Sequence, residues 1–79
     1  MSKVTIYTTP TCHFCKLAKV FFQNNDVDYN EHDVQADLAA RQEMMDKSGQ
    51  MGVPVITVGD ELIIGFDEER LRELLKVTN

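Results

Sequence analysis

The first third of the chain contains two regular patterns of apolar residues. Over residues 3–8, apolar and polar positions alternate, and a period of two predicts a β-strand. From residue 14 onward, apolar positions recur at the spacing of one helix face, which we expect to be buried. The positions on this face are Phe14, Leu17, Ala18, Phe21 and Phe22.

The middle third of the chain is more polar. Residues 27–34 alternate weakly, which predicts a short, polar strand at the edge of a sheet. Asp37 is suited to cap a second helix that runs to about Lys47, and Ser48-Gly49 provides its stop signal. Few residues of this helix are apolar, so we expect it to cover the sheet loosely.

The last third predicts a hairpin and a helix. Residues 55–58 form an apolar run typical of a buried strand, Gly59-Asp60 favours a tight turn, and residues 61–64 return antiparallel. Asp67 is a good N-cap for a final helix. The element order β-α-β-α-β-β-α predicts one α/β domain over residues 1–79, with a parallel, right-handed first βαβ unit.

Composition narrows the possible functions. The net charge of −5 argues against binding to nucleic acid, which needs a basic face. No apolar run approaches the roughly 20 residues that cross a membrane. The N-terminal residues resemble a strand rather than a signal peptide, so we expect a cytoplasmic protein. Nothing in the sequence suggests an oligomer, and we expect a monomer.

Cys12 and Cys15, the only two cysteines, lie between the first predicted strand and the first predicted helix. A C-x-x-C pair in this context indicates a dithiol redox site. Unpaired N–H groups at a helix start stabilise a thiolate, and Cys12 is at or just before the first helical position. Cys15 follows one turn later on nearly the same face. We therefore expect Cys12 to attack a substrate disulfide, and Cys15 to resolve the mixed disulfide, leaving a Cys12–Cys15 disulfide.

Two neighbours are candidates for tuning this pair, and Phe14 is a third neighbour with another possible role. A protonated His13 would stabilise the Cys12 thiolate, and Lys16 would add positive charge nearby; the alternative for both is a solvated helix residue. Phe14 is either an exposed docking residue or the start of the buried helix face. Its spacing favours a partly buried position.

Three segments and the element order together resemble small bacterial glutaredoxin-like proteins of the thioredoxin superfamily, over residues 3–76. The segments are Thr9-Pro10-Thr11-Cys12-His13-Phe14-Cys15, Gly52-Val53-Pro54 and Ile64-Gly65-Phe66-Asp67. The resemblance implies a thioredoxin fold, with a four-stranded mixed sheet in the order 2-1-3-4 flanked by three helices. It also implies a cis Val53–Pro54 bond that presents the Val53 backbone to an extended substrate.

The same resemblance implies a set of ligands and contacts. No bound cofactor is expected beyond the redox-active disulfide, the substrates are disulfide-containing proteins, and glutathione is a possible co-substrate. The implied substrate-binding residues are Thr9, Pro10, Thr11, Phe14, Val53, Pro54, Gly65, Phe66, Asp67 and Glu68.

Departures from the family pattern affect the expected electron donor. Glutaredoxins that use glutathione resemble one another in carrying a lysine three residues before the first cysteine. This chain has Thr9 at that position. They carry a second glycine before the last helix, where this chain has Phe66, and an Asp pair where it has Glu68-Glu69. These differences favour thioredoxin reductase over glutathione as the donor.

Two other functions stay open on the sequence alone. The cysteine pair could belong to a metal or iron–sulfur cluster module, for which His13 and His32 are the further zinc ligands available. His13 would lie on another helix face and His32 on a polar strand, and the altered glutathione site disfavours a shared cluster. The chain could also be a binding module in which the cysteine pair is incidental.

Overall fold

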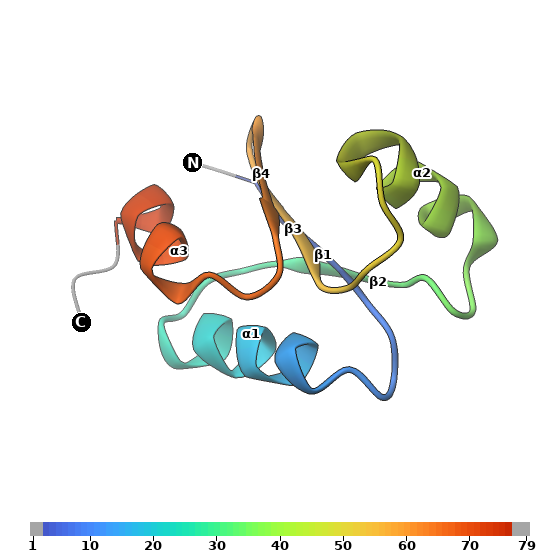
Figure 1. Cartoon of the computed structure of the whole chain (residues 1–79). Coiled ribbons are helices and arrows are strands. Elements are labelled where there is room, and N and C mark those ends of the chain that lie inside the picture. Colours follow the sequence, from blue (N-terminus) through green and yellow to red (C-terminus); the bar gives the residue numbers. More distant parts are fainter. Residues whose placement is uncertain (1–2, 77–79) are drawn as a thin grey trace.

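Four strands form one mixed sheet, which three helices flank in the computed structural model (Figure 1). The structure describes residues 3–76. The elements are β1 (Val4–Thr8), α1 (His13–Asn24), β2 (Asn30–Asp33), α2 (Leu38–Ser48), β3 (Val55–Val58), β4 (Glu61–Ile64) and α3 (Glu68–Leu75). The sheet order is β2-β1-β3-β4, with β1 parallel to β2 and antiparallel to β3, and β3 antiparallel to β4. The expected thioredoxin fold is confirmed.

The helices divide unequally between the two faces of the sheet. Figure 1 shows α1 and α3 together on one face and α2 alone on the other. Because side chains alternate along β1, Ile6 packs into the core under α1 and α3, whereas Tyr7 packs into a smaller core with Ala40 and Met44 of α2. One helix cannot cover a whole sheet face, so part of the α2 side stays open.

Side-chain caps define where the helices begin. Asp37 accepts a hydrogen bond from the Ala40 amide at 3.0 Å, and Asp67 accepts one from the Arg70 amide at 3.1 Å. Each carboxylate satisfies an N–H group that has no partner inside its helix. Gly49 ends α2 with a φ of 72°, a conformation that glycine adopts without a steric cost. The expected starts of α2 and α3 and the stop of α2 are confirmed.

Two details of the sequence interpretation are wrong. Phe14 and Leu17 are 57% and 39% exposed, because Cys15 rather than Phe14 is the first buried residue of α1 and the buried face is centred on Ala18. The edge strand is also shorter than residues 27–34. Residues 27–29 precede β2, although Val27 and Tyr29 still pack against the main core.

Among residues 3–76, no helix has the length and apolar character needed to cross a membrane.

Candidate active site

Cys12 is the N-cap of α1. Its backbone is extended, with φ −81° and ψ 112°, and its Sγ accepts a hydrogen bond from the backbone amide of Cys15 at 3.1 Å. The sulfur therefore occupies the place that a serine or aspartate oxygen takes in other helix caps. An N–H donor and the positive end of the helix dipole both favour negative charge there, so this position stabilises a thiolate.

Cys15 differs from Cys12 in accessibility. It is 1% exposed, whereas Cys12 is only half-buried. The two cysteines form a disulfide, and their Cα atoms are 5.2 Å apart. Because the first turn of α1 brings the sulfurs together, the pair forms a disulfide from local structure alone.

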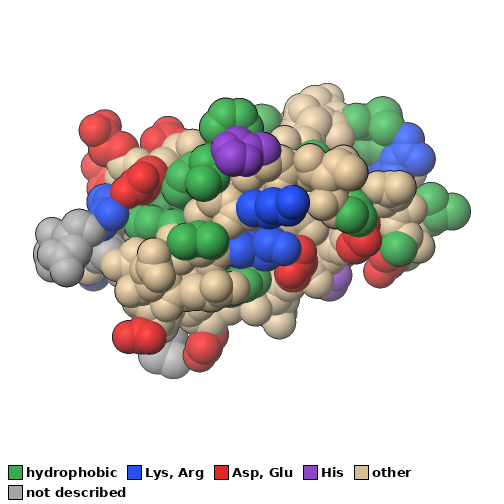
Figure 2. Space-filling model, turned by 90° about the horizontal axis from the view of Figure 1, so that it is seen from below, with side chains coloured by type: hydrophobic (Ala, Val, Ile, Leu, Met, Phe, Trp, Pro, Cys, Tyr) green, Lys and Arg blue, Asp and Glu red, His purple; other side chains and the backbone are tan. Residues whose placement is uncertain are grey.

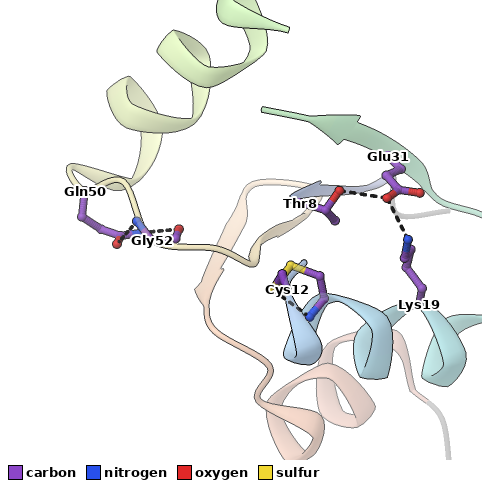
Figure 3. Close-up of a disulfide and its surroundings, with 7 residues drawn as sticks. Thr8, Cys12, Lys19, Glu31, Gln50 and Gly52 are labelled. Atoms are coloured by element: carbon purple, nitrogen blue, oxygen red, sulfur yellow. Dashed lines mark hydrogen bonds and ion pairs between the residues drawn. A yellow bond between two sulfur atoms is a disulfide. The ribbon is translucent and has the colours of Figure 1, made fainter. Parts of the chain in front are cut away.

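A chain of polar contacts lies beside the disulfide, on the side of the sheet edge (Figure 3). Thr8, the buried last residue of β1, donates a hydrogen bond to Glu31 at 2.8 Å, and Lys19 donates one to the same oxygen at 2.9 Å. Burial raises the pKa of Glu31, but the hydrogen bonds from Lys19 and Thr8 outweigh it, and the pKa is lowered. These contacts connect α1 to both β1 and β2 beside the dithiol.

The loop before β3 forms the other wall of the site. The Val53–Pro54 bond is cis, as expected, and Pro54 is buried while Val53 is half-buried. Figures 1 and 3 both show this loop beside the N-terminal end of α1. Its carbonyl at Pro54 accepts a hydrogen bond from the Gly65 amide at 2.8 Å, which joins the start of the α3 segment to the same wall. Three segments distant in the sequence are thus brought together.

The residues next to the cysteines are mostly open to solvent. Pro10, Thr11, His13 and Lys16 are exposed, and the His13 and Phe14 rings meet edge to face at 5.5 Å. Figure 2 views the molecule from the α1 side and shows histidine, hydrophobic and Lys or Arg side chains next to one another on this surface. The expected partial burial of Phe14 is wrong; its ring is available to a partner.

The predicted contacts from the α3 segment are partly engaged within the protein. The Phe66 ring lies edge to face against Phe21 at 6.1 Å and packs onto the main core. Asp67 caps α3, and Glu68 forms an ion pair with Arg72 at 2.7 Å. Neither carboxylate is free of other contacts in this structure.

Arg41 is a neighbour of the site that the sequence reasoning missed. It comes from the N-terminal part of α2, yet with Thr9 and Met51 it lines a depression of about 260 Å³. One guanidinium nitrogen donates to the Met51 sulfur at 3.7 Å. No local signal marks this position, because an arginine on a helix surface is ordinary; only the packing of α2 next to the β1–α1 loop brings it there.

A family model for glutaredoxin matches residues 4–63. The chain belongs to the glutaredoxin family. It is 36% identical over 73 residues to an uncharacterized glutaredoxin-like protein of the rubredoxin operon of Clostridium pasteurianum, covering 92% of this chain and 97% of that protein. It is 35% identical over 68 residues to glutaredoxin 3 of Escherichia coli, covering 86% and 82%.

Solved structures agree with the family assignment. A mutant of the thioredoxin-like protein BC3987 superposes with a TM-score of 0.91 at 33% identity, over 99% of this chain and 100% of that one. The glutaredoxin-like NrdH-redoxin of Escherichia coli, described as having a thioredoxin-like activity profile, gives 0.77 at 25% identity, over 98% and 96%. As a glutaredoxin-family member with an intact cysteine pair, the chain is a thiol–disulfide oxidoreductase.

The metal-binding alternative for this glutaredoxin-family site is not supported. Within residues 3–76, no three His, Cys, Asp or Glu side chains come together as metal ligands would. His32 stacks on the Tyr7 ring at 5.5 Å in the sheet, and His13 lies against Phe14. A closed zinc site needs four ligands, and the two cysteines have no histidine partner here.

Proposed function

We propose that Cys12 and Cys15 reduce protein disulfides, and that thioredoxin reductase rather than glutathione returns the pair to the dithiol form. The observation that supports these roles is the contrast between the two sulfurs. Cys12 is accessible and accepts an amide hydrogen bond at the N-terminus of α1, whereas Cys15 is buried beneath it. An attacking thiolate needs both access and stabilisation, and a resolving thiol needs only to reach the first sulfur.

The proposed reaction has two exchange steps. The Cys12 thiolate attacks one sulfur of the substrate disulfide, forms a mixed disulfide, and releases the other substrate sulfur as a thiolate. The Cys15 thiol then loses its proton and attacks Cys12 Sγ, which releases the second substrate thiolate. Two electrons pass from the protein dithiol to the substrate disulfide. We place this reaction in the cytoplasm, because a reducing compartment maintains the dithiol.

Two residues support the choice of donor. Thr9 is uncharged, whereas glutathione-dependent glutaredoxins resemble one another in carrying a lysine at this position. Phe66 is large, whereas they have a glycine there. The structural similarity to NrdH-redoxin points the same way. Arg41 points the other way, since it places one cation beside Thr9. The missing lysine at Thr9 and the missing glycine at Phe66 outweigh the charge of Arg41, because Arg41 is already in contact with Met51.

The test measures NADPH consumption with a protein disulfide in two parallel reactions. One contains thioredoxin reductase, and the other contains glutathione and glutathione reductase. We expect turnover with thioredoxin reductase and little with glutathione, and no turnover of the Cys12→Ser variant with either. Turnover with glutathione alone would contradict the donor assignment, and silence in both reactions with intact thiols would contradict the exchange reaction itself.

A gain-of-function variant sharpens the donor test. Thr9→Lys with Phe66→Gly supplies the missing charge and removes the ring, and we expect about tenfold faster turnover with glutathione, the value of one new charge-assisted contact. The matched control is Thr11→Lys with Phe66→Gly, which adds the same charge two residues away. Equal gains in both variants would show a general charge effect rather than a restored glutathione contact.

A further inference from the structure

A large hollow lies on the α2 face of the sheet, away from the dithiol. It has a volume of about 510 Å³ and is lined by β1, β2, β3 and α2. Because α2 covers only the half of this face near the end of β1, the half near the start of β1 stays open (Figure 1). A hollow of this size accommodates a small metabolite.

Hydrogen-bond donors from three neighbouring strands converge on the floor of the hollow. The sheet register places Thr5 of β1 opposite both Asn30 of β2 and Thr57 of β3, so an amide and two hydroxyl groups form a row. His32 lies one pair further along β2, opposite Tyr7. All of these residues line the hollow.

Two lysines add positive charge at the rim. Lys3 precedes β1, and Lys47 is on the last turn of α2, where its Nζ donates to the Tyr7 hydroxyl at 3.4 Å. The chain has 8 Lys and Arg residues against 13 Asp and Glu. The lining thus contains two lysines and a histidine, together with two glutamates.

The two acids that line the hollow are already engaged. Glu43 accepts from the Tyr7 hydroxyl and lies 3.9 Å from Lys47, and Glu31 accepts from Thr8 and Lys19 on the other side of β2. These contacts use one oxygen of each carboxylate. The lysine ammonium groups, the threonine hydroxyls and the Asn30 amide can all donate to an anionic ligand.

Thr5 is the most buried member of this row. The residue is 9% exposed and lines the hollow, and within residues 3–76 its hydroxyl forms no hydrogen bond to another side chain. Among these residues Arg72 Nη1 is the buried side-chain atom that lacks a partner, so the Thr5 hydroxyl is open to solvent rather than buried and unpaired. A hydroxyl that lines the hollow without a protein partner is available to donate to a ligand there.

We propose that this hollow binds a phosphate group, carried by a small phosphomonoester or as the free ion, through Lys47, Lys3 and the hydroxyls of Thr5 and Thr57. Phosphate offers three or four strong acceptor oxygens and a double charge, which match the two ammonium groups and the two hydroxyl donors of this lining. The site is independent of the dithiol chemistry.

The test is an NMR titration of the oxidised protein with inorganic phosphate and, separately, with glycerol 2-phosphate. Sodium chloride keeps the ionic strength constant. We expect saturable shifts of the amides of residues 3–5, 30–32 and 57–59 with both probes. Tighter binding of the ester would identify a phosphorylated metabolite as the ligand, and equal binding would identify the phosphate ion.

Two variants test the assigned contacts. Lys47→Met should weaken binding by about tenfold or more, and Thr5→Val by about fivefold, as expected for one charge-assisted and one neutral hydrogen bond. Valine keeps the shape and strand preference of threonine, so the second variant tests the site even if the first loosens α2. Lys16→Met, which removes an equal charge from α1 on the opposite face of the sheet, is the matched control and should leave phosphate binding unchanged.

Three results would overturn the proposal. Shifts that grow linearly, or that chloride alone reproduces, would indicate a general salt effect. Saturable shifts confined to residues 12–16 would place the anion at the start of α1. Equal affinity in the Thr5→Val, Lys47→Met and Lys16→Met variants would show that these donors do not bind it.

Discussion

The two cysteines of the dithiol differ in solvent exposure, and this difference leads to a prediction at the scale of single residues. Cys15, at 1% exposure, is reached by Cys12 but not by a protein substrate. In Cys15→Ser, the mixed disulfide on Cys12 should accumulate. Its resolution should slow by at least about a thousandfold, because well-oriented intramolecular groups act at effective molarities of about 10⁵ M or more.

Mass spectrometry of the trapped adduct after reaction with a disulfide substrate measures this effect. The control is Cys12→Ser, in which we expect no adduct because the remaining thiol is buried. An adduct that forms on Cys15 of that control as readily as on Cys12 would show that the assigned roles are wrong.

Residues of the site differ in how far the sequence could predict them. Cys12 and Pro54 were predictable, because the C-x-x-C spacing at a strand–helix junction and a proline at the start of a strand are local signals. Phe14 was not, since helical periodicity omits cysteine from the apolar face and Cys15 took the buried position. Arg41 was not either, because its place beside Thr9 depends on how α2 packs.

At the scale of elements, α2 depends strongly on its N-terminal cap. Only Ala40 and Met44 of this helix are buried, so packing stabilises it weakly, and Asp37 supplies the hydrogen bond to its first turn. Replacing a capping aspartate by alanine costs about 1 kcal/mol. In a domain of this size, we therefore expect Asp37→Ala to lower the Tm by roughly 4–8 °C.

Thermal unfolding followed by circular dichroism measures the change, and Asp28→Ala is the matched control. Asp28 is an exposed loop residue, so its replacement should change the free energy of unfolding by less than about 0.5 kcal/mol. Amide hydrogen exchange should show the Asp37→Ala effect in residues 38–48. Equal melting temperatures for the two variants would mean that the cap contributes nothing to α2.

The caps also explain why the elements were predictable from sequence while their faces were less so. Asp37, Asp67 and Gly49 act through contacts within a few residues, and a local rule predicts local contacts. The edge strand was overestimated because residues 27–29 alternate as a strand would, yet Val27 and Tyr29 reach the core from an irregular segment. Residues 30–33 pair with β1 and form a strand, whereas residues 27–29 do not, and the periodicity of a sequence does not reveal which residues pair.

At the scale of the whole molecule, the strand order followed from the family resemblance, but the unequal covering of the sheet did not. The hollow on the α2 face exists because one short helix must cover four strands. Its floor combines residues from three strands that are distant in the sequence, such as Thr5 and Thr57. Only the register of the sheet brings them together.

Two carboxylates connect the layers of the molecule and should govern its stability in acid. Glu31 joins β2 to β1 and α1, and Glu43 joins α2 to β1 through the Tyr7 hydroxyl. For Glu31, the hydrogen bonds from Lys19 and Thr8 outweigh burial, and for Glu43, the hydrogen bond from Tyr7 dominates. Both pKa values are lowered from the usual 4.5.

The sign of the pH effect follows from these lowered values. Near and below pH 4.5, the unfolded chain binds protons at these carboxyls that the folded protein resists, so stability falls as the pH falls. The contribution is complete above the unfolded pKa and is lost as the pH passes through the folded pKa. Removing either carboxyl should therefore make stability fall less steeply as the pH falls. Each removal should reduce the slope of unfolding free energy against pH by the equivalent of up to one bound proton.

Urea unfolding from pH 7 to pH 3 measures that slope in the Glu31→Gln and Glu43→Gln variants, with Asp28→Asn as the control for an exposed acid. We expect both glutamine variants to be less stable than the parent at pH 7 and to lose less of their stability in acid, while the control follows the parent. A parent slope retained in both variants would show that other carboxyls determine the acid response, and that the contacts of Glu31 and Glu43 do not connect the two faces energetically. Flattening in Glu31→Gln alone would locate the acid-sensitive connection beside the dithiol, between α1 and the sheet edge, and leave α2 held by its cap and its small core.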